Sequence, residues 1–113
     1  MSEERTFRVG LDDALQRVES AGDKRWAVVF EHGSLEVELY APRGTDPQQP
    51  HTRDEAYIVV AGRGSFECSG QRSRFAPGDF LFAPAGAVHR FVDFSDDLVV
   101  WVLFYGPEGG ERP

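Results

Sequence analysis

The apolar residues before residue 26 recur at helical spacing. They outline one face of a helix at Leu11, Ala14, Leu15 and Val18. Asp12 and Asp13 place negative charge where such a helix begins, and residues 20–22 would end it. The pattern therefore predicts one short amphipathic helix that packs against the rest of the chain.

After Trp26 the apolar period shortens to two, which indicates strands. About eight short strand candidates are separated by turn residues, over residues 26–31, 34–40, 55–61, 65–68, 71–75, 80–83, 89–94 and 98–105. We expect residues 80–83 to form a short buried strand, and residues 42–50, which hold three prolines, to form a loop. Since no helices alternate with these strands, the spacing predicts an all-β antiparallel fold, a closed barrel or a jelly roll.

Length and charge narrow the range of functions. A chain of 113 residues has room for one modest core, so we expect a single domain with a tail and helix over residues 1–25 and a flexible tail over residues 107–113. With 12 Lys and Arg against 19 Asp and Glu, the net charge of −7 argues against binding to nucleic acid or to an anionic membrane surface.

Residues 1–6 are interpreted as a frayed tail without the features of a signal peptide. The lone Cys68 excludes an internal disulfide and fits a cytoplasmic location.

Two separate stretches hold side chains that suit a metal ion. His51 and Glu55 stand at the start of the strand candidate 55–61, and His89 follows the 80–83 candidate after a turn. If these strands pair, two imidazoles and one carboxylate meet at one point, which is the facial arrangement of non-haem Fe(II) sites. Mn, Ni and Zn suit similar ligands, so the expected cofactor is a divalent metal whose identity stays open.

Glu55 and the residues next to it also have interpretations that need no metal. An unpaired carboxylate at the start of an apolar strand is costly to bury, and a salt bridge from Glu55 to Arg53 or Arg90 would offset that cost as a metal would. Tyr57 shares the face of Glu55, so it is a candidate catalytic residue, although filling the core is the slightly favoured role. Asp54 falls on the opposite face and is expected to be solvated.

These stretches resemble the two sequence motifs of the cupin superfamily. His51 has the spacing to Glu55 of the first motif, and Glu55 lies seven residues before Gly62, as in the family. The run Pro84-Ala85-Gly86-Ala87-Val88-His89 is similar throughout to the end of the second motif, which Gly78-Asp79 opens at the usual distance. The resemblance covers residues 26–105 and implies that residues 26–106 form a double-stranded β-helix, the cupin jelly-roll barrel, with one short helix before it.

The resemblance also implies a metal site at His51, Glu55 and His89, with one departure from the family. The family's first histidine falls on Gln49, whose carbonyl oxygen is a weaker and neutral ligand. Gln49 could bind the metal, hold a water there, or leave the position to Gln48 through a shift of the loop. Three ligands with open positions suit catalysis or substrate chelation better than a closed structural site.

Two classes of function follow from this resemblance. The first is a small divalent-metal-dependent enzyme, similar to dioxygenases or isomerases, that acts on a small oxygenated molecule. The second is a non-catalytic small-molecule-binding or sensor module, although the residues before the barrel leave no room for a helix-turn-helix. Similar cupins commonly form dimers, and sheet edges need covering, so we expect a homodimer.

Overall fold

The computed structural model describes residues 6–113, which contain one α-helix, one short 3-10 helix and eight strands. Helix α1 spans Leu11–Ser20, and the 3-10 helix η1 spans Gly22–Lys24. The strands are β1 (Trp26–His32), β2 (Leu35–Tyr40), β3 (Asp54–Ala61), β4 (Gly64–Cys68), β5 (Gln71–Phe75), β6 (Phe80–Ala83), β7 (His89–Val92) and β8 (Val99–Tyr105). These elements lie where the sequence pattern predicts them. Of the tail expected over residues 1–6, residues 1–5 fall outside the described part.

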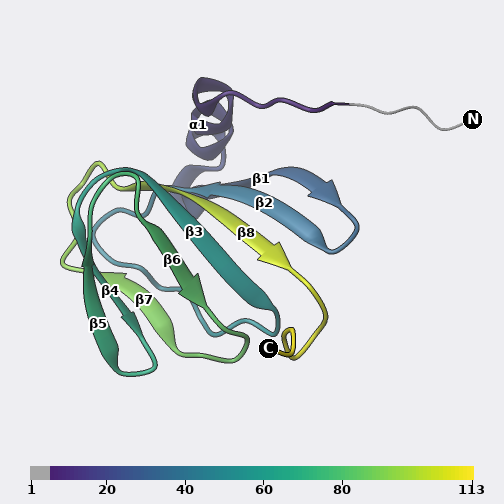
Figure 1. Ribbon diagram of the computed structural model, residues 1–113. Helices are drawn as coiled ribbons and strands as arrows, with labels where there is room; N and C mark the ends of the chain where they lie inside the picture. The colour runs from purple at the N-terminus through teal and green to yellow at the C-terminus, as the bar shows by residue number, and fades with distance from the viewer. Residues whose placement is uncertain (1–5) are drawn as a thin grey trace, which may run out of the picture.

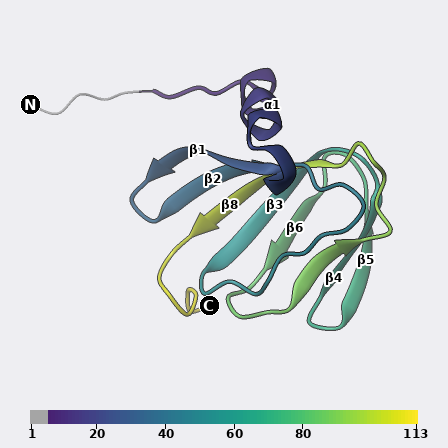
Figure 2. The same ribbon diagram turned by 180° about the vertical axis from the view of Figure 1, so that it is seen from behind.

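The strands form two antiparallel sheets that make the two layers of a jelly roll (Figures 1 and 2). The larger sheet has the order β1-β2-β8-β3-β6, and the smaller sheet has the order β5-β4-β7. The core consists of buried apolar and aromatic residues from both sheets, namely Tyr40, Tyr57, Val59, Phe66, Phe75, Ala83, Phe91, Leu98, Val100, Val102 and Phe104. The predicted all-β jelly-roll fold with one N-terminal helix is confirmed.

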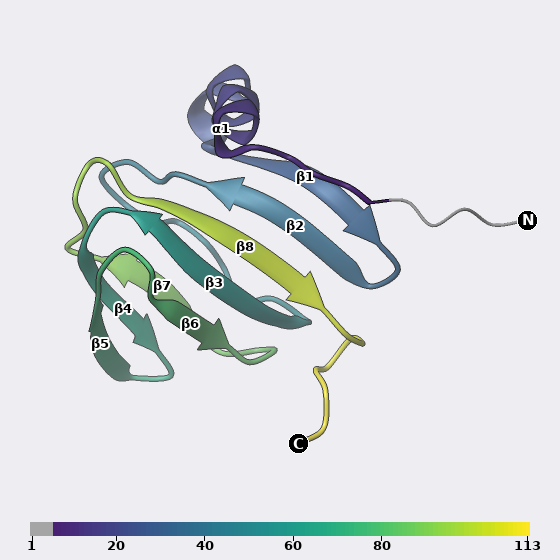
Figure 3. The same cartoon turned by 45° about the horizontal axis from the view of Figure 1, so that its top comes forward.

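Helix α1 packs on the outside of the larger sheet, beside β1 and β2 (Figure 3). Its buried Ala14 and Val18 share an apolar cluster with Val29 of β1 and Leu39 of β2. Because side chains alternate along a strand, the residues of β2 that lie between its helix-facing positions point toward the other sheet. The charged face of β2 is therefore its inner face, which reverses the usual arrangement of a half-buried strand.

The turn from β3 to β4 depends on a glycine that belongs to the first sequence motif. Gly62 has a φ angle of +98°, a backbone conformation that residues with a side chain rarely adopt. A Cβ atom at this position would also lie 2.6 Å from the Cα atom of Leu98. Glycine is thus required both by the backbone angle and by the close approach of the segment that leads into β8.

Strand β6 is less buried than the sequence predicts. Phe80 is 64% exposed and Phe82 is 41% exposed, whereas Ala83 is buried. The reason is the position of β6 as the last strand of the larger sheet, where helix α1 does not cover the outer face. A short apolar run cannot reveal whether both faces of its strand are covered, so the expectation of a buried strand is wrong.

Asp54 and the C-terminal residues also differ from expectation. Asp54 is 5% exposed, and its carboxylate accepts hydrogen bonds from the backbone N–H groups of Ala85 at 2.9 Å and Glu111 at 2.8 Å. The Gly109 N–H also donates to the Thr52 carbonyl at 2.6 Å. The C-terminal segment is therefore tied to the start of β3 and is not a free tail.

Within residues 6–113, no helix is long and apolar enough to cross a bilayer.

Candidate metal centre

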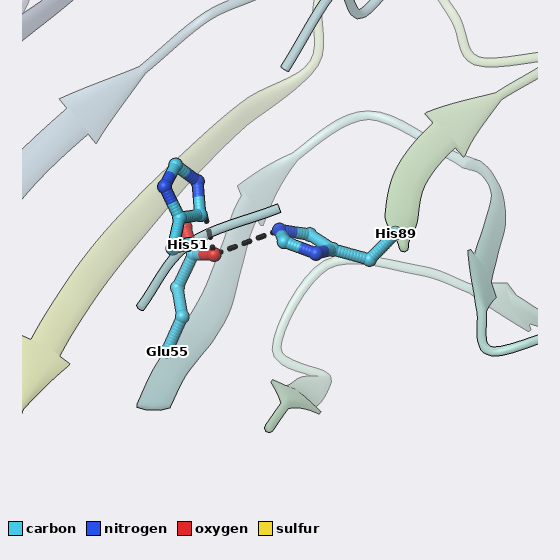
Figure 4. A group of neighbouring side chains, drawn as sticks. All are labelled: His51, Glu55 and His89. Carbon is cyan, nitrogen blue, oxygen red and sulfur yellow. Dashed lines mark ion pairs between the residues drawn. The ribbon is translucent and has the colours of Figure 1, made fainter. Parts of the chain in front are cut away.

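The three expected ligand residues meet between the two sheets. His51 lies in the loop before β3, Glu55 lies near the start of β3, and His89 begins β7 in the smaller sheet. As expected, the apolar run before His89 pairs with β3, since Glu55 is opposite Ala83 of β6. The potential ligand atoms of the three residues lie within 4.8 Å of one another and face the same point (Figure 4).

The contact between His89 and Glu55 has an unusual feature. The Nδ1 atom of His89 lies 2.8 Å from the Ala87 carbonyl oxygen, so we assign the ring hydrogen to Nδ1 in the neutral imidazole. The Nε2 atom then presents a lone pair to Glu55 Oε1, which lies 2.8 Å away. Both atoms are buried, and neither has a hydrogen-bond partner in the described chain. Two buried lone pairs at this distance require a cation or a proton between them.

Without a metal, a proton can be shared between His89 and Glu55, because the surroundings of His89 favour its charged form. Burial alone would lower the pKa of His89, because it disfavours the charged ring. A protonated Nε2 would donate a hydrogen bond to Glu55, and this bond, the Ala87 carbonyl and the charge of Glu55 outweigh burial, so the pKa of His89 is raised above its ordinary value. A proton can thus occupy the space between the two side chains. A divalent ion would serve the same atoms and could also reach His51, whose Nε2 is 3.6 Å from Glu55 Oε1.

The alternative explanation for the buried Glu55 carboxylate is a salt bridge to an arginine. The structure does not form that salt bridge within residues 6–113. Arg53 lies 3.9 Å from the Glu36 carboxylate instead and donates to the Ser34 carbonyl. Arg90 is exposed. Glu55 is only 2% exposed, and the cationic or imidazole nitrogens within 4.0 Å of its carboxylate in residues 6–113 are those of His51 and His89.

The two glutamines of the preceding loop lie in different environments. The amide of Gln48 donates to Asp46 at 2.6 Å, and its oxygen accepts a hydrogen bond from the Tyr57 hydroxyl at 3.1 Å. Gln49 is exposed at the edge of the cavity described below, and its amide makes one long contact of 3.5 Å with the Pro47 carbonyl. The side chain of Gln49 is therefore the freer of the two to turn toward a metal. A ligand role for either residue stays a prediction.

Asp46 holds the loop in place, and sequence reasoning missed it. Its carboxylate is 8% exposed and accepts hydrogen bonds from the Tyr40 hydroxyl at 2.5 Å and the Phe91 N–H at 2.8 Å, besides the amide of Gln48. One carboxylate thus joins β2, β7 and the loop that leads to His51. The only sequence signal is an aspartate among prolines and glycine, which is typical of any turn.

Tyr57 is part of the packed core. Its side chain is fully buried and makes edge contacts with the rings of Phe66 and Phe91. Burial, followed by the nearby Glu55, raises the pKa of the Tyr57 hydroxyl well above its ordinary value. The hydroxyl is therefore a neutral donor to Gln48. A catalytic role for Tyr57 stays a prediction, and its position agrees with the core role that the pattern slightly favoured.

A cavity of about 500 Å³ lies beside the cluster. Its lining combines His51 and Glu55 with other acidic, basic, polar and aromatic residues, namely Lys24, Trp26, Glu36, Glu38, Tyr40, Pro47, Gln48, Gln49, Thr52, Arg53, Val102 and Phe104. A cavity of this size accommodates a small organic molecule. The site thus joins two imidazoles and a carboxylate, which suit a divalent metal, to a space for a ligand.

Comparison with known proteins agrees with this architecture. Residues 36–105 match the family described as the cupin domain. An uncharacterised protein of Streptomyces coelicolor is 36% identical over 98 residues, which cover 85% of this chain and 93% of that protein. An acireductone dioxygenase of Bacillus mycoides is 37% identical over 65 residues, which cover 52% of this chain and 38% of that enzyme.

A solved structure shows the same relationship. The structure of KdgF from Halomonas sp. superimposes with a TM-score of 0.63 and 26% sequence identity, over 74% of this chain and 78% of that one. The family match over residues 36–105 includes the smaller sheet and every strand of the larger sheet except β1, and it contains His51, Glu55 and His89. The chain belongs to the cupin family.

Proposed function

We propose that the chain is a divalent-metal-dependent enzyme that acts on a small oxygenated molecule, with the metal held by His51, Glu55 and His89. The observation that carries this proposal is the buried pair of atoms Glu55 Oε1 and His89 Nε2, which lie 2.8 Å apart without a hydrogen-bond partner. A bound divalent metal would supply Lewis-acid or redox chemistry at its open coordination positions. Fe, Mn, Ni and Zn all suit this ligand set.

The residues of the chain have distinct tasks in this proposal. The Ala87 carbonyl holds the His89 ring in the orientation that directs Nε2 to the metal. Glu55 neutralises part of the metal charge, and the apolar side chains of Val102 and Phe104 form the dry part of the cavity wall. The similarity to an acireductone dioxygenase supports an enzyme over a purely structural protein.

The alternative is a non-catalytic small-molecule-binding or sensor module. Gln49 favours this alternative, because a glutamine in place of the family's first histidine weakens the expected metal site. The Fe, Mn, Ni and Zn forms can be mixed in air with a panel of hydroxy acids, oxo acids and sugars, and the mixtures followed by proton NMR. The proposal predicts that at least one form converts a compound, and that Glu55→Gln treated in the same way does not. Selective binding without conversion in any metal form would support the sensor module instead.

We also propose that the protein acts in the cytoplasm, where the lone Cys68 would stay reduced. Two copies of the chain are proposed to pair through the outer face of β3 and β6. Ile58 is 43% exposed and lies opposite Phe80 on the edge strand of the sheet. With Phe82 these residues form an uncovered apolar surface beside an unpaired strand edge. Light scattering should give about twice the chain mass of 12.6 kDa for the wild type and the single mass for Phe80→Asp. A wild-type monomer at micromolar concentration would contradict this.

A further inference from the structure

Two acidic residues of β2 face the cavity instead of solvent. Glu36 and Glu38 both line it, together with Glu55, Lys24 and Arg53. The register of β2 that packs its apolar side chains under helix α1 turns these carboxyl groups inward. This packing leaves both carboxyl groups beside the space where a ligand would lie.

The two carboxyl groups differ in their partners. Arg53 approaches Glu36 at 3.9 Å, whereas within residues 6–113 no Lys, Arg or His nitrogen lies within 4.0 Å of the Glu38 carboxyl group. The strands on either side place apolar residues opposite Glu38, namely Val28 of β1 and Val102 of β8. Glu38 therefore lacks a cation of its own in a partly buried position.

The surroundings of Glu38 favour its neutral form. Burial raises the pKa of Glu38 to about 8, and the hydrogen bond and charge of Glu36 and the charge of Glu55 add to the rise. Lys24 acts in the opposite direction. At neutral pH Glu38 is thus a carboxylic acid that can donate a hydrogen bond.

We propose that Glu38 is a second functional carboxyl of this cavity, placed to give a hydrogen bond or a proton to an oxygen atom of a ligand held at the His51–Glu55–His89 cluster. When the proton moves, an O–H bond forms on the ligand and Glu38 becomes a carboxylate, whose charge Lys24 offsets. Glu36 acts as the positioning partner of Glu38. This inference rests on the proposed function, because it places the ligand at the metal cluster.

The charged and aromatic residues that line the cavity also indicate which class of ligand it accepts. The cations of the cavity already have aromatic partners, since Lys24 lies 4.3 Å from the ring centroid of Trp26 and Arg53 lies 5.9 Å from that of Phe104. An organic cation would compete with both of these contacts. A small molecule with two separated oxygen groups, one for the metal and one for Glu38, meets no such competition.

The first test follows the Glu38 carboxyl group directly. Protein labelled with 13C in the glutamate carboxyl groups would be titrated from pH 4 to pH 10, with Glu38→Gln to assign the signal. We expect one glutamate to titrate with a midpoint near pH 8, to be missing in the variant, and to titrate at lower pH after zinc is added. A midpoint at the ordinary glutamate value would overturn the inference. So would a midpoint that does not move although the imidazole signals show that zinc is bound.

The second test uses oxalate as the probe ligand between pH 6 and pH 10, because it is fully ionised over this range and binds metals through two of its oxygens. On zinc-loaded protein, we expect the dissociation constant of the wild type to rise severalfold relative to that of Glu38→Gln as the pH rises above the lowered Glu38 midpoint that the first test measures with zinc. A ratio that is constant with pH would overturn the role of Glu38 toward the ligand. If none of zinc, iron, manganese and nickel binds, the proposed function is contradicted, and if oxalate fails to bind the metal-loaded protein, the ligand class inferred for this cavity is contradicted. In either case a midpoint near pH 8 in the first test still supports Glu38 as the carboxyl group that holds a proton.

Discussion

The two ends of the barrel interior are built from the same sheets but have opposite character. At one end, the ring of Phe91 lies between those of Tyr57, Phe66 and Phe75, with centroids 5.1, 5.2 and 5.4 Å away. At the other end, charged and titratable side chains surround a cavity, and a carboxylate is buried to 2% exposure. The four rings of the first end carry no charge and fill their space by packing, whereas the second end keeps space and charge at a cost in stability.

The comparison indicates that the aromatic end stabilises the fold, and the proposed function places the chemistry at the charged end. Burying aromatic side chains is among the largest favourable contributions to folding. Burying a carboxylate such as Glu55 is unfavourable unless cations surround it. The aromatic end also holds the site in position, because Tyr57 and Phe66 pack around the His89 ring.

The largest effect on stability is expected at the aromatic end. Phe91→Ala removes the ring that contacts three other aromatic side chains and leaves a cavity in the core. We expect the free energy of unfolding to fall by about 3–5 kcal/mol, measured by urea denaturation. Phe91→Leu is the control, because it keeps most of the buried volume and should cost less. A loss below about 1 kcal/mol for Phe91→Ala would contradict the assigned role of this end.

A smaller loss of stability is expected when Asp46, which lies between the two ends, is replaced. Asp46→Ala leaves the buried Phe91 N–H and the Tyr40 hydroxyl without their acceptor. We expect a loss of about 1–3 kcal/mol in the free energy of unfolding, together with weaker metal binding, because the loop that leads to His51 is released. Asp96→Ala, at an exposed position, is the matched control. Unchanged stability would show that Asp46 does not hold the loop.

An effect of opposite sign, a gain in stability, is expected at the charged end. The pKa of Glu38 rises from 4.5 to about 8 on folding, so between these pH values the folded chain holds a proton that the unfolded chain releases. The stability of the wild type should therefore decrease as the pH rises from 4.5 to 8. Glu38→Gln lacks this titration, so its melting temperature should exceed that of the wild type above pH 8 and approach it near pH 4.5. Parallel melting curves of the two proteins at all pH values would contradict the buried acid.

The sequence predicts the elements of the fold and the three expected metal ligands, but not the acidic wall of the cavity. The helix and strands follow from apolar periods and turn residues, and His51, Glu55 and His89 follow from their spacing. Glu38 was missed because alternation along β2 shows two faces without telling which face is inside. Only the position of helix α1, outside the larger sheet, decides that the charged face is the inner one. The exposure of β6 depends on the same tertiary arrangement, which a short apolar run does not encode.

The central claim is that His51, Glu55 and His89 hold one divalent metal. Elemental analysis of protein purified without a chelating tag, beside Glu55→Ala and His89→Ala, tests it most directly. His32→Ala is the matched control, because His32 is exposed on the β1–β2 hairpin, away from the cluster. We predict close to one Fe, Mn, Ni or Zn per chain in the wild type and in His32→Ala, and loss of the metal in the other two variants. A wild type that holds no metal, and whose melting temperature does not rise when any of the four metals is added, would contradict the claim.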